Sequence, residues 1–265
     1  MILRNGWIIF FIFLLTLMLI WAALLQINPQ KETIWNYGFN LGYGLIYLMA
    51  GLLSLWQFET QRVLHSLSKS FLYLGLGLIS FSVALLIWFY INIFVKIPMP
   101  FPSVADFFFV LFYPLTFVGL LYLIKAHGSP KESISSLRVL IILTAFALPI
   151  IILTSLWSKD NTITQGAKFF SYLYPVGDIL IMTMATLLLD ISTTRIRKGA
   201  LFLIAACSSL VLADLTFAYR SSVNIYWNGD ISDILYTVAG FLFSISIVSL
   251  VSGVLNNPID PNLKD

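Results

Sequence analysis

Charged residues are widely spaced along the chain, and the stretches between them are almost entirely apolar. Most of these stretches reach the length of about 20 helical residues that crosses the hydrocarbon core of a bilayer. Eight such intervals can be read from the sequence: Arg4 to Lys31, Glu32 to Glu59, Lys69 to Lys96, Asp106 to Lys125, Arg138 to Lys159, Lys168 to Asp190, Lys198 to Arg220 and Asp233 to Asp260. Because they lack the alternation of a transmembrane barrel, we expect eight transmembrane helices and an all-α fold.

The composition supports this interpretation. Hydrophobic residues make up 59% of the chain and charged residues only 10%, whereas soluble proteins carry about a quarter charged residues. The first apolar run, from Trp7 to Leu25, is longer than a signal-peptide core and lacks a small-residue cleavage site. We expect it to remain as the first helix of a single membrane domain covering residues 1–265.

The distribution of Lys and Arg predicts the orientation, because these residues collect on the cytoplasmic side of short loops. With eight spans, the face that holds both termini carries Arg4, Arg62, Lys69, Lys125, Lys131, Arg138, Arg195, Arg197, Lys198 and Lys264. The opposite face carries only Lys31, Lys96, Lys159, Lys168 and Arg220. We therefore expect a multi-pass protein of the cell membrane with both termini in the cytoplasm. The net charge of +3 is then a topology signal, and nucleic acid is not expected as a partner.

Aromatic residues near the ends of the predicted spans are typical of interfacial anchors. They are Trp35, Tyr37, Trp157, Tyr226 and Trp227. The single cysteine, Cys207, excludes an intrachain disulfide bond and falls within the seventh span, where a small packing residue is expected.

An internal repeat is suggested by two long segments, Leu76 to Leu123 and Leu203 to Leu250, which place Asp106 opposite Asp233. Helix two from Asn40 can likewise be set against helix six from Tyr174. The corresponding repeats are residues 1–125 and 137–255. Because each would hold four helices, the two halves would share one orientation in the membrane.

Four aspartates are the main candidates for chemistry, and two of them fit helix caps. Ser103 with Asp106, and Asp230 with Asp233, have the spacing of an N-cap residue and the third residue of a helix. A carboxylate there accepts hydrogen bonds from free backbone N–H groups and faces the positive helix end. Capping and ligand binding both stay open for Asp106 and Asp233.

The other two aspartates, Asp178 and Asp214, lie inside predicted spans, where carboxylates are costly and usually face the bundle interior. Asp178 follows Pro175 and Gly177, which can kink a helix. In the expected orientation all four carboxyl groups can converge on one cavity that opens away from the cytoplasm. The predicted ligand-binding residues are Asp178, Asp214, Asp106, Asp233, Tyr113, Tyr174 and Asn40, with Tyr43 beside them. The alternative is a hydrogen-bonded network that only joins the helices.

Several chemistries lack the residues that they require. His65 and His127 both fall in predicted cytoplasmic loops, so no intramembrane histidine pair is present for haem or zinc. No nucleophile elbow, phosphate-binding loop or histidine-containing triad appears. We expect no cofactor, no metal and no enzymatic activity.

The motifs PFPSVADFFFVLFYPL, YPVGDILIM, VLADLTFAY and GDISDILY occur in this order over nearly the whole chain. In this order they resemble the multi-span N-terminal sensor region of some bacterial GGDEF/EAL signalling proteins and histidine kinases. The resemblance implies a sensor or receptor-like module in which Asp106, Asp178, Asp214 and Asp233 belong to recurring motifs. Such regions lead into a cytoplasmic catalytic module, whereas this chain ends at Asn256 to Asp265, shortly after the last predicted span. We expect the signal to pass to a separate cytoplasmic partner or through homo-oligomer contacts.

Three other functions compete with the sensor hypothesis. An ion-coupled transporter or channel would use acidic residues near the middle of the membrane. An intramembrane lipid hydrolase would use carboxyl groups as acid and base. A structural subunit of a larger membrane complex would need no ligand.

Overall fold

The computed structural model describes residues 2–60, 65–127, 165–192 and 196–255, and every regular element in these ranges is helical. The predicted all-α fold is therefore confirmed for this part of the chain. The elements are α1 (Ile2–Ile27), α2 (Ile34–Thr60), α3 (His65–Tyr90), the π-helical turn η1 (Ile91–Val95), α4 (Val104–His127), α6 (Gln165–Ile191), α7 (Arg197–Ser222) and α8 (Ile231–Leu255).

Seven of the described helices are long and apolar enough to cross a membrane. They correspond in order to seven of the eight expected spans; the remaining one, Arg138 to Lys159, lies outside the described residues. Several apolar side chains of α1 are more than half exposed, including Ile9 at 66% and Leu24 at 62%. Exposed apolar surface of this kind is stable in contact with lipid, which supports a membrane protein.

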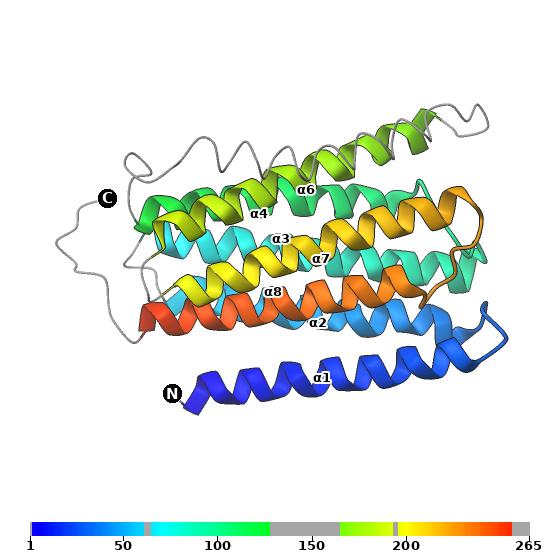
Figure 1. Ribbon diagram of the computed structural model, residues 1–265, viewed down its shortest axis with the longest axis horizontal. Helices are drawn as coiled ribbons and strands as arrows, with labels where there is room; N and C mark the ends of the chain where they lie inside the picture. The colour runs from blue at the N-terminus through cyan, green and yellow to red at the C-terminus, as the bar shows by residue number, and fades with distance from the viewer. Residues whose placement is uncertain (1, 61–64, 128–164, 193–195, 256–265) are drawn as a thin grey trace.

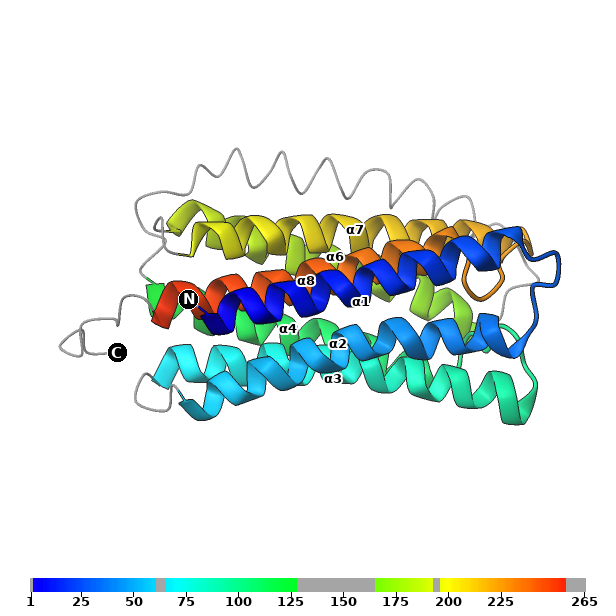
Figure 2. The ribbon, with the colours of Figure 1, turned by 90° about the horizontal axis from the view of Figure 1, so that it is seen from below.

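Six of the described helices form a closed ring. Each of α2, α3, α4, α6, α7 and α8 packs against the next, and α8 returns to α2. Helix α1 lies outside the ring against α2 and α8, as Figures 1 and 2 show from two sides. The ring encloses an interior that the polar residues can share away from lipid.

Small residues bring neighbouring helices of the ring into close contact. A side chain at Gly51 of α2 would lie 2.9 Å from the carbonyl oxygen of Gly75 in α3, and one at Gly119 of α4 would lie 2.8 Å from Leu74. Such approach is typical of membrane helices, whose association depends on packing because lipid supplies no hydrophobic driving force.

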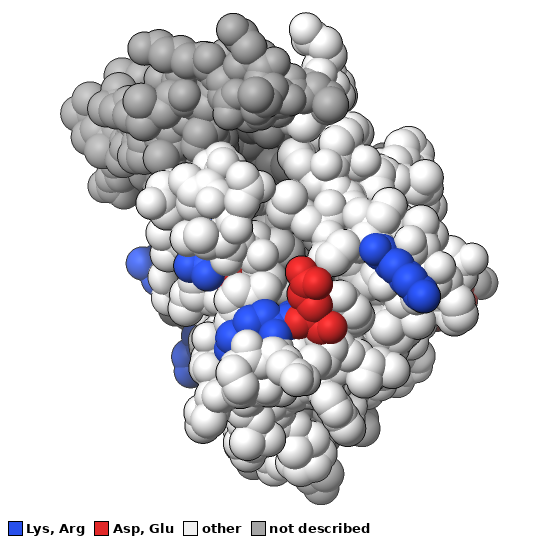
Figure 3. All heavy atoms as spheres, turned by 90° about the vertical axis from the view of Figure 1, so that its right-hand side faces the viewer, with Lys and Arg blue, Asp and Glu red and all other residues white. Residues whose placement is uncertain are grey.

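The two ends of the bundle differ. The end near the start of α1 is filled by buried apolar residues, including Phe71, Leu123, Leu188, Leu203 and Leu250. At the opposite end, which we call the distal end, α2, α4, α6 and α8 begin and α1, α3 and α7 finish (Figure 1). Viewed onto the distal end, most of the surface is uncharged, with a few Lys and Arg side chains around one acidic group (Figure 3). The polar interior lies beneath this end.

Candidate functional site: an acidic, aromatic cavity at the distal end

A cavity of about 280 Å³ lies inside the ring toward the distal end. Every helix of the ring contributes to its wall, together with the segments that precede α4 and α8. Aromatic side chains form much of the lining: Tyr43, Phe81, Trp88, Phe101, Phe109, Tyr113, Tyr174, Phe217, Tyr226 and Tyr236. This volume is near the lower end of the about 300 to 1,000 Å³ of small-molecule sites, so the cavity suits a small ligand.

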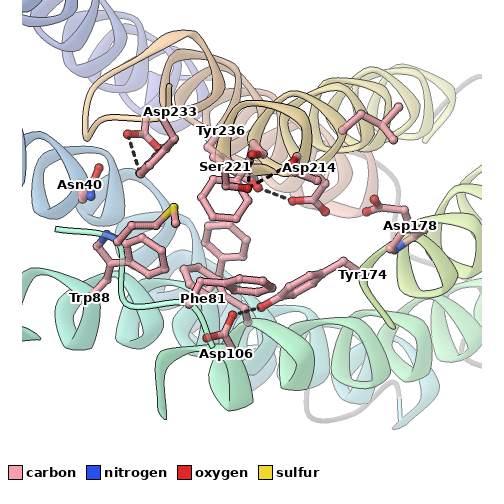
Figure 4. A pocket seen from close by; sticks show the side chains of 18 of the residues that line it. Asn40, Phe81, Trp88, Asp106, Tyr174, Asp178, Asp214, Ser221, Asp233 and Tyr236 are labelled. Atoms are coloured by element: carbon pink, nitrogen blue, oxygen red, sulfur yellow. Dashed lines mark hydrogen bonds between the residues drawn. The ribbon is translucent and has the colours of Figure 1, made fainter. Parts of the chain in front are cut away.

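All of the ligand-binding residues that the sequence predicted line this cavity. Asp106 comes from α4, Asp178 from α6, Asp214 from α7 and Asp233 from α8, and their carboxyl groups face one space (Figure 4). Asn40, Tyr43, Tyr113 and Tyr174 also line it. Three of the four aspartates are no more than 2% exposed, and Asp214 is partly accessible from the cavity.

The expected cap at the start of α4 is confirmed, and its carboxyl group also serves the cavity. Oδ2 of Asp106 accepts a hydrogen bond from the backbone N–H of Ser103 at 2.6 Å, and Ser103 Oγ accepts one from the N–H of Ala105 at 3.2 Å. Oδ1 of Asp106 accepts a hydrogen bond from the Tyr174 hydroxyl at 2.5 Å. The capping and cavity interpretations therefore both apply, one to each oxygen.

The cap at the start of α8 is similar, except that its second aspartate accepts the N–H of the residue before the N-cap. Asp230 is the N-cap, and its Oδ1 accepts a hydrogen bond from the N–H of Ser232 at 2.8 Å. Oδ2 of Asp233 accepts one from the N–H of Gly229 at 2.6 Å, in a turn where Gly229 has a φ of 95°. The hydroxyl groups of Tyr43 and Tyr226 lie 3.5 and 3.4 Å from Oδ1 of Asp233.

Asp178 and Asp214 form the innermost polar group of the cavity. The Tyr113 hydroxyl lies 2.8 Å from Oδ2 of Asp214 and 3.2 Å from Oδ1 of Asp178. The Tyr236 hydroxyl donates a hydrogen bond to the other oxygen of Asp214. The Tyr113 hydroxyl therefore connects the two carboxyl groups, one from α6 and one from α7.

The Gly-Asp pair in α6 explains how Tyr113 comes to contact the carboxyl group of Asp178. A Cβ atom at Gly177 would lie 2.4 Å from Cγ of Tyr113, so only glycine lets the Tyr113 ring lie against the α6 backbone. The next residue, Asp178, then meets the Tyr113 hydroxyl. Pro175, inside the same helix, also lines the cavity.

Asn228 joins the segment before α8 to the rest of the distal end. Its Nδ2 donates to the Pro98 carbonyl at 2.8 Å, and its Oδ1 accepts from Nδ2 of Asn40 at 2.5 Å and from Nε1 of Trp88 at 2.9 Å. The remaining polar atom of Asn40, Oδ1, has no hydrogen-bond partner although the residue is only 1% exposed. A buried acceptor without a partner is costly unless a ligand or water meets it.

Tyr226 corrects one expectation. The sequence suggested an interfacial anchor, whereas Tyr226 lines the cavity, packs edge-on against Phe217 with ring centroids 4.9 Å apart and contacts Asp233. Burial and the nearby charges of Asp233 and Asp230 raise the pKa of Tyr226 well above its ordinary value. Trp35 is 66% exposed, as a side chain at the membrane interface would be.

The cavity contains acidic groups without basic ones. No Lys, Arg or His is among the lining residues that the structure describes. Arg220, beyond the lining, pairs with Asp230. The histidines belong elsewhere: they were expected in loops, but His65 begins α3 and His127 ends α4, both at the end opposite the cavity. Within the described ranges, no three His, Cys, Asp or Glu side chains lie close enough together to hold a metal ion.

The fold and the site together define an all-helical membrane protein with a small acidic, aromatic cavity beneath its distal end. Comparison of the chain with protein-family models, with curated protein sequences and with solved structures gives no match. The resemblance to bacterial sensor regions therefore depends on the sequence motifs alone.

Proposed function

We propose that this protein is a membrane sensor or receptor-like module that binds a small ligand in the distal cavity. The observation that carries the proposal is the convergence of four carboxyl groups, from α4, α6, α7 and α8, on one space of about 280 Å³. A ligand that contacts all four helices changes their relative stability, and helix movement is a means of passing a signal across the membrane.

The topology of this proposal has eight spans with both termini in the cytoplasm, and the cavity then faces outward. Four-plus-four repeats agree with the two equivalent caps, in which Ser103 with Asp106 and Asp230 with Asp233 each place a carboxyl group at the cavity. The signal would pass to a separate cytoplasmic partner or to a second copy of the chain.

A ligand screen tests the proposal. The purified protein in mild detergent is analysed by native mass spectrometry for retained small molecules, and each candidate is then tested for thermal stabilisation. We expect a ligand that stabilises the native protein and loses this effect in Asp178→Asn and Asp214→Asn. If a ligand stabilises the native protein and both variants equally, the site assignment is wrong.

An ion-coupled transporter or channel is the second candidate, and the two carboxyl groups of Asp178 and Asp214 inside the bundle, both in contact with the Tyr113 hydroxyl, favour it over a lipid hydrolase or a structural subunit. Flux into liposomes distinguishes it from a sensor. Transport that Asp178→Asn abolishes would replace the sensor proposal with this one.

A further inference from the structure

The cavity has the chemistry of a site for a positively charged organic molecule, and this inference rests on the proposed binding function. We propose that the ligand is an organic ammonium ion with an apolar or aromatic part. The proposal depends on three features of the lining: its carboxyl groups, its aromatic rings and one buried acceptor without a partner.

The hydrogen bonds around the carboxyl groups favour a negatively charged lining. Asp214 accepts hydrogen bonds from two tyrosine hydroxyls, while Asp106 and Asp233 each accept a backbone N–H and lie in the first turn of a helix. Donors and a helix N-terminus both stabilise the ionised form of a carboxyl group. No basic residue in the described lining offsets the charge of an ionised aspartate.

The arrangement of the carboxyl groups disfavours a bare metal ion. A divalent cation needs several oxygen ligands around one point, and the described residues form no such cluster. Asp106, Asp233 and the Asp178–Asp214 pair instead occupy different parts of the wall (Figure 4). An extended molecule can reach such separate groups.

Aromatic rings cover the wall between these acidic groups. Trp88 lies edge-on to Phe217 and Tyr226, with centroids 6.1 and 6.5 Å apart, and Phe81 packs against Phe109 at 4.9 Å. Aromatic faces attract organic cations, and they also accept the apolar part of a ligand. An inorganic cation would gain nothing from contact with this apolar surface.

Asn40 supplies an independent indication of a bound donor. Asn40 is a lining residue whose Nδ2 donates to Asn228, whereas its Oδ1 is buried and has no hydrogen-bond partner. An ammonium N–H is a donor that satisfies this oxygen and is attracted by the same carboxyl groups. An anionic ligand would leave the oxygen unsatisfied and would be repelled.

Three small probes of similar shape test the charge preference: benzylammonium, benzyl alcohol and benzoate. Binding to the full chain in lipid nanodiscs is measured by calorimetry at neutral pH. We expect benzylammonium to bind at least about tenfold more tightly than benzyl alcohol, and benzoate not to bind, because a charge-assisted hydrogen bond is roughly twice as strong as a neutral one.

Substitutions assign the preference to the cavity. Asp214→Asn and, separately, Asp233→Asn should weaken benzylammonium binding and leave benzyl alcohol binding unchanged. Glu32→Gln is the matched control, since it removes an exposed carboxylate at the same end of the bundle. An equal loss in Glu32→Gln would show that general surface charge is responsible and overturn the proposal.

The outcomes separate this inference from the function on which it depends. Equal or tighter binding of benzyl alcohol overturns the ammonium class and leaves a ligand-binding cavity in place. If none of the three probes binds, the result contradicts both the ammonium class of ligand and the ligand-binding function of the cavity. Because the first comparison uses the native chain, it holds even if a substituted protein does not fold.

Discussion

At the residue scale, the capping aspartates use their two oxygens differently. In Asp106 one oxygen accepts a backbone N–H at the start of α4, while the other accepts the Tyr174 hydroxyl. Asp233 likewise accepts a backbone N–H on Oδ2 and has the Tyr43 hydroxyl near Oδ1. A helix cap fixes the carboxyl group in space, and the cavity receives a preoriented acceptor without further ordering.

Asn228 should matter for stability more than its place between two helices suggests. Replacing it by alanine leaves buried donors on Trp88 and Asn40 without partners, and the Pro98 carbonyl keeps only its hydrogen bond from Asn92. We expect Asn228→Ala to lower the free energy of unfolding by about 2 to 3 kcal/mol, measured by denaturation in mixed micelles. Asn28→Ala, at a less buried asparagine of the same end that bonds only its own turn, should cost little; a similar loss in both would contradict this role.

The titration of Tyr226 should make the folded protein less stable at alkaline pH. Its pKa is raised in the folded protein, mainly by burial, from an ordinary value of 10.0. Above about pH 10 the unfolded chain releases this proton while the folded chain keeps it, so the free energy of unfolding falls by about 1.4 kcal/mol per pH unit for this residue. Below that pH the contribution is fully present.

Tyr226→Phe removes the titrating group and tests this prediction. The slope of stability against pH above pH 10 should become less steep by the contribution of one tyrosine, as measured by denaturation over a pH series. An unchanged slope would show that Tyr226 titrates alike in the folded and unfolded chain.

The sequence could identify the four aspartates because carboxyl groups are rare in membrane spans and costly there. It could not identify Trp88, Tyr226 or Tyr236 as cavity residues. Aromatic residues of membrane helices occur in contact with lipid, at the interface and in the interior, and the sequence does not distinguish these positions. Asn228 was missed for a related reason: Asn before Gly is an ordinary turn pair, and nothing local shows what it contacts.

At the element scale, one glycine controls the contact between α4 and α6. A methyl group at Gly177 would meet the Tyr113 ring and push apart the helices that carry Tyr113 and Asp178. We expect Gly177→Ala to lower the free energy of unfolding by about 1 to 3 kcal/mol and to weaken ligand binding. Gly6→Ala in α1, where a Cβ would meet nothing within 4 Å, is the control and should be neutral.

The helices themselves could be predicted well from the spacing of charges. Charged residues mark the borders because they are costly in lipid, and the predicted intervals overlap each described helix. The exact ends could not be predicted. The third span extends beyond α3 into the π-helical turn Ile91–Val95, where Asn92 donates hydrogen bonds to the Ile97 and Pro98 carbonyls, and such local bonding has no sequence signature.

At the scale of the whole molecule, the ring of six helices decides the site. It places α4 beside α6 and α2 beside α8, so that residues about 190 positions apart, such as Tyr43 and Asp233, meet. Helix order around a bundle depends on small differences in packing between similar apolar faces, so the sequence alone could not provide it. The convergence of the aspartates was inferred from their similar depth in the membrane.

The proposed orientation can be measured with the single native cysteine as background. In a Cys207→Ala chain, Glu32→Cys places a thiol at the distal end and Lys125→Cys places one at the other end. With both termini in the cytoplasm, a membrane-impermeant maleimide should label the first in intact cells and the second only after permeabilisation. The reverse pattern would show that the cavity faces the cytoplasm.

A cation-binding site at the distal end requires that water reaches the cavity and that the cavity attracts cations. Ala218 lines the cavity, and a cysteine introduced there in the Cys207→Ala chain can react with a trimethylammonioethyl or a sulfonatoethyl methanethiosulfonate. We predict modification by both reagents, with the cationic one faster by about tenfold or more relative to its rate with a free thiol. A thiol that stays unmodified, or that reacts with both at equal relative rates, would contradict the account.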